Sequence, residues 1–139
     1  MGPNDVERFA ERIAQSGVHA IDAPMSGGPA RARDGTMSLM VACADAVFEA
    51  NRSLIAALSN QVFRISQRPG DGVRTKLINN LQAGINLVGA AEALALAERP
   101  GLDPAMTLAV IEQSSGQSSI GTDRLRRALS GDLAPRAHM

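Results

Sequence analysis

The spacing of apolar residues predicts a helix at the beginning of the chain. Val6, Phe9 and Ile13 recur at helical intervals after Pro3, and proline is well suited to the first turn of a helix. Gly17 then provides a natural helix end. We therefore predict one helix between Pro3 and Gly17.

Three β-favouring runs follow, each bounded by turn residues. They predict strands at residues 18–22, 36–42 and 61–66, because short runs of this kind between turn residues are typical of strands. After the first strand, residues 25–29 have the composition of a turn. Before the last strand, residues 45–58 predict a helix with an inner side formed by Val47, Leu54, Ile55 and Leu58.

The pattern becomes helical after a cluster of breaking residues at 67–72. Residues 73–98 predict one helix of about 26 residues, near 39 Å long. An Asp-Pro pair begins a second helix at 103–113, and a third helix covers residues 120–129. The chain is thus an α/β segment followed by an all-α part built on one long helix.

The composition is that of a globular protein without a charge bias. The 139 residues are 45% hydrophobic and 20% charged, values near the average for soluble domains. The 14 Lys and Arg balance the 14 Asp and Glu, so the formal net charge is zero. Nucleic-acid binding needs a basic surface, and the 3 phenylalanines are the only aromatic side chains that could stack on bases. We therefore expect no nucleic-acid partner.

Metal sites and membrane segments are also disfavoured. Cys43 is the only cysteine, and the 2 histidines, His19 and His138, are far apart in the sequence, so we expect no zinc site. A single thiol cannot form an internal disulfide, which fits a reducing, cytoplasmic setting. The polar N-terminus does not resemble a signal peptide. The most apolar window, residues 81–97, contains polar residues, and we interpret it as a buried helix rather than a membrane span.

Two short segments could carry chemistry, and the first is Ser26-Gly27-Gly28. It follows the first predicted strand, and open α/β sheets bind ligands beyond the carboxyl ends of their strands. Two glycines let the backbone approach a ligand and present N–H groups to an anion, and the Ser26 hydroxyl adds a donor. Taken alone, the signal is weak, because a serine–glycine turn is usually no more than a turn.

The second segment comprises Lys76, Asn79 and Asn80, near the start of the long predicted helix. Lys76 and Asn80 are four residues apart and share a helix face, beside an apolar stripe that includes Leu77 and Leu81. Desolvation lowers the pKa of a lysine from about 10.4 toward the working range of an acid/base catalyst. The alternative is a lysine whose stem lies on apolar surface while its ammonium group stays in water.

Together these motifs resemble those of the β-hydroxyacid dehydrogenase family, of the 3-hydroxyisobutyrate dehydrogenase type. The family's substrate motif, Asp-x-Pro-x-Ser-Gly-Gly, is matched at residues 22–28, and its catalytic motif, Gly-x-x-x-Lys-x-x-Asn-Asn, is matched at residues 72–80. The resemblance covers nearly the whole chain. It implies that residues 1–70 are the C-terminal part of an NAD(P)-binding Rossmann-type domain. It also implies that residues 71–139 are the first part of a helical substrate and dimerisation domain.

The resemblance implies hydride transfer between NAD or NADP and a small 3-hydroxy acid, or the matching aldehyde acid. Lys76 would be the general acid/base on the hydroxyl oxygen. Ser26 and the N–H groups of Gly27–Gly28 would hold the substrate carboxylate. The amides of Asn79–Asn80 would orient the substrate or the lysine.

Four further residues are not expected to be catalytic. We expect Asp22 to be structural rather than catalytic, and Cys43 to be a small buried apolar residue rather than a nucleophile. Arg31 and Arg33 follow the glycine turn. They could pair with an anionic substrate, but a solvated surface charge is the simpler interpretation.

The chain departs from the family pattern at both ends. It contains no Gly-x-Gly-x-x-Gly loop, which in such folds places the pyrophosphate at a helix N-terminus. We therefore expect this chain alone to bind no nicotinamide cofactor with useful affinity. The family's Lys-Asp motif and later helices are also missing. We interpret the chain as an internal segment that lacks the N-terminal dinucleotide-binding half and the C-terminal helices.

Two other functions stay open. The chain could be a non-catalytic helical interaction or assembly module that retains the substrate-binding scaffold. It could also be an anion binder built on Ser26-Gly27-Gly28, although it lacks the Gly-Lys-Ser/Thr ending of a P-loop. The predicted helix at 73–98 is apolar on most of its circumference, and such a helix needs cover on every side. We therefore expect a homodimer or a larger assembly.

Overall fold

The computed structural model describes residues 1–134, and the chain divides into two compact units. The first unit is Met1–Asn79, and the second begins at Asn80. The helix α5, Asp71–Glu98, contributes its first turns to the first unit and the rest to the second.

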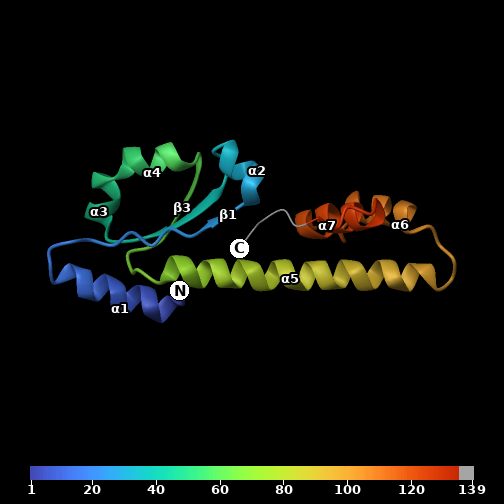
Figure 1. The fold of residues 1–139 in the computed structure, drawn as a ribbon, viewed down its shortest axis with the longest axis horizontal. Helices are drawn as coiled ribbons and strands as arrows, with labels where there is room; N and C mark the ends of the chain where they lie inside the picture. The colour runs from blue at the N-terminus through green and yellow to red at the C-terminus, as the bar shows by residue number, and fades with distance from the viewer. Residues whose placement is uncertain (135–139) are drawn as a thin grey trace. The chain divides into compact units, whose positions relative to one another are not determined.

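The first unit is a three-stranded sheet with short helices (Figure 1). The sheet order is β1-β2-β3, with β1 antiparallel to β2 and β2 parallel to β3. The bounds of its elements before α5 are α1 Pro3–Ala14, β1 Met25–Ser26, α2 Gly28–Arg33, β2 Ser38–Ala42, α3 Asp45–Ala50, α4 Arg52–Leu58 and β3 Gln61–Ser66.

The core of this unit lies on the central strand. Leu39 and Val41 of β2 are buried with Cys43 and with Ile55 of α4. Five consecutive residues, 39–43, are buried, as is typical of a strand covered on both faces. The expectation that Cys43 is a small buried apolar residue is confirmed, and burial raises the pKa of its thiol.

Arg64 of β3 fastens the carboxyl ends of the two parallel strands. Its guanidinium donates hydrogen bonds to the carbonyl oxygens of Cys43 and Ser66. It also pairs with the Asp45 carboxylate at 2.8 Å and lies over the Phe48 ring, 4.9 Å from the centroid. One side chain thus supplies donors to the carbonyl oxygens at the ends of both strands, in addition to the backbone bond that the Ser66 carbonyl accepts from Cys43 N.

The predicted strand at 18–22 is wrong, because only Asp22 of this segment pairs, in an isolated antiparallel bridge with Ala42. The pairing continues through Pro24, whose carbonyl accepts from Met40 N at 3.0 Å. It ends at β1, inside the segment predicted as a turn, and α2 was not predicted. Val18 is exposed, and a β-favouring residue without a neighbouring strand forms no strand.

The helix predicted at 45–58 is broken into α3 and α4 at Asn51, which has φ −115° and ψ 13°. The Asn51 amide donates to the carbonyl oxygen of Val47 at 2.8 Å, a local bond that competes with the helical ladder. After this break, α4 turns different side chains toward the core than one continuous helix would. Ile55 is buried, but Leu54 and Leu58, predicted on the inner side, are more than half exposed.

The second unit contains the rest of α5 with α6, Pro104–Glu112, and α7, Ser119–Leu129. All three helices begin within two residues of their predicted positions. The Asp103 side chain caps α6 by accepting from Ala105 N at 2.9 Å, and Ser118 caps α7 by accepting from Gly121 N at 3.1 Å. Gly121 also lets α7 approach α5 closely, because a Cβ there would lie 3.0 Å from the Cβ of Ala90.

The apolar residues of α5 are less covered than a buried helix would have them. More than half of each side chain is exposed for Leu77, Ile78, Leu81, Ile85, Val88 and Leu96. The expectation of a helix buried within the chain is therefore not met. Among the described residues, no helix is long and apolar enough to cross a membrane.

Candidate functional site

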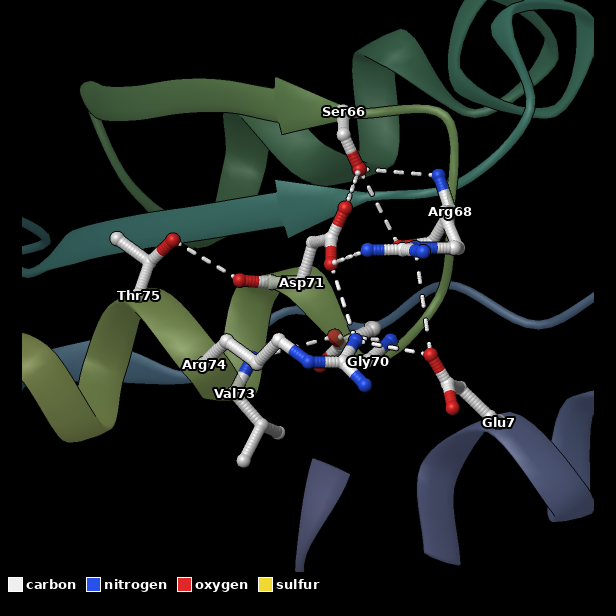
Figure 2. Close-up of polar contacts among 9 residues, drawn as sticks. Glu7, Ser66, Arg68, Gly70, Asp71, Val73, Arg74 and Thr75 are labelled. Carbon is white, nitrogen blue, oxygen red and sulfur yellow. Dashed lines mark hydrogen bonds and ion pairs between the residues drawn. The ribbon is translucent and has the colours of Figure 1, made fainter. Parts of the chain in front are cut away.

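The start of α5 is surrounded by polar contacts centred on the Asp71 carboxylate (Figure 2). It accepts from the Ser66 hydroxyl at 2.8 Å, from Arg68 at 2.9 Å and from Arg74 at 3.0 Å. Arg74 also pairs with Glu7 of α1 at 2.8 Å. The hydrogen bonds from Arg68 and Ser66 lower the pKa of Asp71 to about 2. The first and fifth helices of the chain are thus linked by charge.

A second carboxylate, Asp22, contacts the backbone of the same helix start. One of its oxygens accepts from Gly70 N at 2.8 Å and from Val73 N at 3.2 Å. Asp22 is 6% exposed, so both bonds are largely shielded from water. A carboxylate facing free N–H groups at a helix start is favoured by hydrogen bonding and by the helix dipole. These contacts agree with the structural role expected for Asp22.

Gly72 brings the two sequence motifs into contact. A Cβ at this position would lie 2.6 Å from the Met40 carbonyl oxygen and 2.9 Å from both Asp22 Oδ2 and Pro24 Cδ. Only glycine fits so close an approach. Gly72 belongs to the second motif, and Asp22 and Pro24 belong to the first, so the motifs meet within one unit.

Lys76 lies one turn after Gly72, within the part of α5 that belongs to the first unit. It is half-buried, and burial lowers the pKa of its amine, in the direction expected from the sequence. It is also the only lysine of the chain. Asn79 and Asn80 follow on the next turn, and both are exposed.

The glycine turn follows β1 rather than the strand predicted at 18–22. Gly27 and Gly28 have φ values of 140° and 71°, a region that residues with a Cβ rarely adopt. Ser26 is half-buried, and Arg31 is exposed with its aliphatic part over Gly27. Arg33 is exposed as well. Within residues 1–134, neither arginine forms an ion pair with another side chain.

The candidate site therefore consists of two segments, the Ser26–Gly28 turn and the first turns of α5. Both segments begin near the contact between the two motifs. From the contact between Gly72 and Pro24, the segment leading to β1 and the first turns of α5 run in the same direction (Figure 1). Among the described residues, no hydrogen bond joins the glycine turn to Lys76. No group of three metal-ligating side chains is found in residues 1–134 either.

Sequence reasoning named Asp22, Pro24 and Gly72 as motif positions but did not predict that they touch. The sequence assigned Asp22 a structural role but did not say what it holds, and it treated residues 67–72 as a cluster of breaking residues. The available signal was an Asp-Gly pair after Pro-Gly, at the start of a helix. That signal gives no partner, because Asp22 lies 48 residues before Gly70.

Two family models together cover almost the whole chain. The model described as NAD-binding of NADP-dependent 3-hydroxyisobutyrate dehydrogenase matches residues 70–139. The model described as the NAD binding domain of 6-phosphogluconate dehydrogenase matches residues 1–66.

Curated relatives and solved structures agree with these models. L-threonate dehydrogenase from Cupriavidus necator is 37% identical over 133 residues, which are 96% of this chain and 45% of the relative. 3-Hydroxyisobutyrate dehydrogenase from Pseudomonas aeruginosa is 38% identical over 116 residues, 84% of this chain and 39% of the relative.

The crystal structure of 3-hydroxyisobutyrate dehydrogenase from Salmonella typhimurium matches with a TM-score of 0.87 and 32% identity, over 98% of this chain and 48% of that one. Psf3 in complex with NADP+ and 2-OPP matches with a TM-score of 0.82 and 31% identity, over 94% of this chain and 46% of that one. The chain spans less than half the length of each of these proteins.

Proposed function

The chain belongs to the β-hydroxyacid dehydrogenase family, and on that premise we propose that it is the substrate-handling part of an NAD(P)-dependent dehydrogenase. Its fold is the end of a Rossmann-type domain followed by a helical region built on α5. We place the domain boundary after residue 70. The proposed substrate is a small 3-hydroxy acid or the matching aldehyde acid, and the proposed location is the cytoplasm.

Lys76 is the proposed general acid/base. In oxidation its neutral amine takes the proton of the substrate hydroxyl while hydride leaves the same carbon. In reduction the ammonium group returns that proton to the carbonyl oxygen. Burial lowers the pKa of Lys76, which makes both forms accessible nearer neutral pH. A positioned proton donor of this kind typically contributes about 10²- to 10⁴-fold in rate.

The proposed carboxylate site is Ser26 with the N–H groups of Gly27–Gly28. Positive φ values at both glycines turn successive amides into an arrangement that favours an anion. The exposed amides of Asn79 and Asn80 are proposed to orient the substrate or Lys76. The observation that carries the proposal is the contact of Gly72 with Asp22 and Pro24, because the first residues of both motifs meet there.

The chain lacks the glycine loop that holds the pyrophosphate of a dinucleotide in Rossmann-type folds. The sequence has no Gly-x-Gly-x-x-Gly loop, so no group here is assigned to the pyrophosphate. NAD or NADP supplies or accepts the hydride in the complete enzyme. We propose that this chain alone does not hold it.

A second candidate function is a non-catalytic helical interaction module. The exposed apolar side chains of α5, such as Ile78 and Leu81, favour it for this chain in isolation. If the protein encoded by the complete reading frame transfers no hydride with any hydroxy acid, that result would support this alternative.

The test of the dehydrogenase proposal compares Lys76→Ala and Lys76→Arg in the complete reading frame. Both should slow single-turnover hydride transfer at least about tenfold, more than 1.4 kcal/mol in barrier, and leave cofactor affinity unchanged. Arginine keeps the positive charge but does not titrate, so it separates proton transfer from charge. A Lys76→Ala enzyme within twofold of wild type contradicts the assignment.

Ser26→Ala tests the carboxylate site separately. It should raise KM for the acid more than it lowers kcat, because the hydroxyl binds the carboxylate in the ground state and in the transition state alike. Losing one hydrogen bond to a charge costs about 1.5–3 kcal/mol. An uncharged substrate analogue is the control, and an equal loss with that analogue would show that Ser26 does not bind the carboxylate.

A further inference from the structure

Asp22 is fixed on two sides. Its backbone pairs with Ala42 of β2 in both directions, at 3.1 and 2.8 Å. Its buried side chain accepts from the N–H groups of Gly70 and Val73 at the start of α5. Asp22 is therefore a direct link between the central strand of the sheet and the helix that carries Lys76.

We propose that Asp22 is a positioning residue of the reaction, which sets where Lys76 stands relative to the Ser26–Gly28 turn. This inference rests on the proposed function. It goes beyond that function because it gives Asp22, whose side chain contacts the backbone at the start of α5, an influence on the rate through the position of Lys76.

The link between Asp22 and the start of α5 leaves little room for movement. A Cβ on Gly72 would lie 2.6 Å from a backbone oxygen of β2 and 2.9 Å from Asp22 Oδ2, so the first turn of α5 already rests against both. A contact this close resists compression, and the two hydrogen bonds to Asp22 resist separation. The helix start is thus held from both directions.

Both functional segments depart from this link. Lys76 lies four residues beyond Gly72, about 6 Å along the helix axis at 1.5 Å per residue. Ser26 lies four residues beyond Asp22, about 13 Å along an extended chain. A small tilt at the link is therefore enlarged at the lysine amine. A misplacement of about 1 Å in a catalytic group can cost about 100-fold in rate.

Asp22 acts through geometry rather than through its electric field. The cause of the lowered pKa of Lys76 is burial, with no contribution from a nearby carboxylate. A tilt of α5 that exposes Lys76 should therefore raise its pKa, whereas a mere change of charge at Asp22 should not. This difference gives the inference a direct measurement.

The first arm of the test uses this chain without any cofactor. Reductive ¹³C-methylation labels Lys76, the only lysine, and NMR follows its titration apart from that of the N-terminal amine. In Asp22→Ala the pKa of Lys76 should move up toward that of an exposed lysine. In Asp22→Asn it should stay near wild type, because the amide oxygen can accept the same two N–H groups.

Ser59→Ala is the matched control. Ser59 is the other buried polar residue among those described, 3% exposed. Its hydroxyl donates to the Met37 carbonyl and accepts from Gln61 N at 3.0 Å, at the opposite end of the strands. Ser59→Ala should lower Tm to an extent comparable with Asp22→Ala and leave the pKa of Lys76 unchanged. An unchanged Lys76 pKa in a folded Asp22→Ala chain, or an equal shift in Ser59→Ala, overturns the inference.

The second arm measures kcat and KM in the complete reading frame. Asp22→Ala should lower kcat at least about tenfold, Asp22→Asn should restore it to within about threefold, and Ser59→Ala should match wild type below its Tm. A kcat that follows Tm equally in all variants shows a structural role only and overturns the inference. If the wild-type enzyme transfers no hydride, the proposed function fails, and the Lys76 titration still decides whether Asp22 positions the lysine.

Discussion

At the scale of single residues, the ionisation of Lys76 is tied to folding. Burial lowers the pKa of its amine in the folded chain, whereas the unfolded chain has a value near 10.4. Between these two values the unfolded chain binds more protons than the folded chain, so the free energy of unfolding rises with pH in that window. Below the folded-state pKa, the amine is charged in both the folded and the unfolded chain. Its partial burial then lowers the free energy of unfolding by an amount that does not change with pH.

Lys76→Met keeps most of the length of the side chain and removes this cost. We expect the variant to be at least as stable as wild type near neutral pH, and the difference to shrink as the pH rises toward about 10. Urea unfolding of both proteins at several pH values measures it. A difference that does not change with pH would show that Lys76 titrates normally.

At the scale of elements, α1 and the start of α5 are joined by the contacts of Asp71, Arg74 and Glu7. The pKa of Asp71 is held at about 2, below its value of about 3.9 in an unfolded chain. A depressed carboxylate pKa stabilises the folded chain fully above the unfolded value. That contribution is lost as the pH falls toward 2.

Asp71→Asn should therefore be less stable than wild type near pH 6, and the two proteins should converge on acidification to about pH 2. Denaturant unfolding followed by circular dichroism measures the convergence. Glu49→Gln is the control, because Glu49 pairs with Arg52 at 3.4 Å and both side chains are mostly exposed. It should change little at any pH. A constant gap between Asp71→Asn and wild type would contradict the role of ionisation.

The elements that the sequence predicted well have local causes. The strand at 61–66, the long helix and the two later helices follow from periodicity and from caps such as Asp103, all within a few neighbouring residues. The errors have distant or competing causes. Residues 18–21 pair with no strand in the part of the chain that the structure describes, and Asn51 forms a local hydrogen bond that divides a helix. Pattern reasoning sees neither the missing neighbour nor the competing bond.

The candidate site could likewise be predicted from the sequence only where its signals are local. The glycine turn and Lys76 could be singled out because their chemistry lies within short motifs. The contact between the motifs could not be, because Gly72 meets Met40 and Asp22, residues far from it in sequence. Their proximity depends on the completed sheet, which no local pattern specifies.

At the scale of the whole molecule, the exposed apolar side chains of α5 predict self-association. Contiguous apolar patches larger than a few hundred Å² usually mark interfaces. We expect a homodimer or a larger species at micromolar concentration, measured by light scattering. Leu81→Glu should shift the population toward monomer, whereas Leu54→Glu, at a position on α4 that is also more than half exposed, should not. A wild-type monomer of 14.5 kDa would contradict the prediction.

The close contact at Gly72 also divides the glycines of α5 by how freely they can mutate. Gly84 and Gly89 have no atom within 4 Å of the place where a Cβ would stand, and alanine there would favour the helix by about 1 kcal/mol each. At position 72 every other amino acid adds an atom that the Met40 carbonyl oxygen already excludes. Substitutions are therefore sterically tolerated at Gly84 and Gly89 but not at Gly72, which is the position where the two motifs meet.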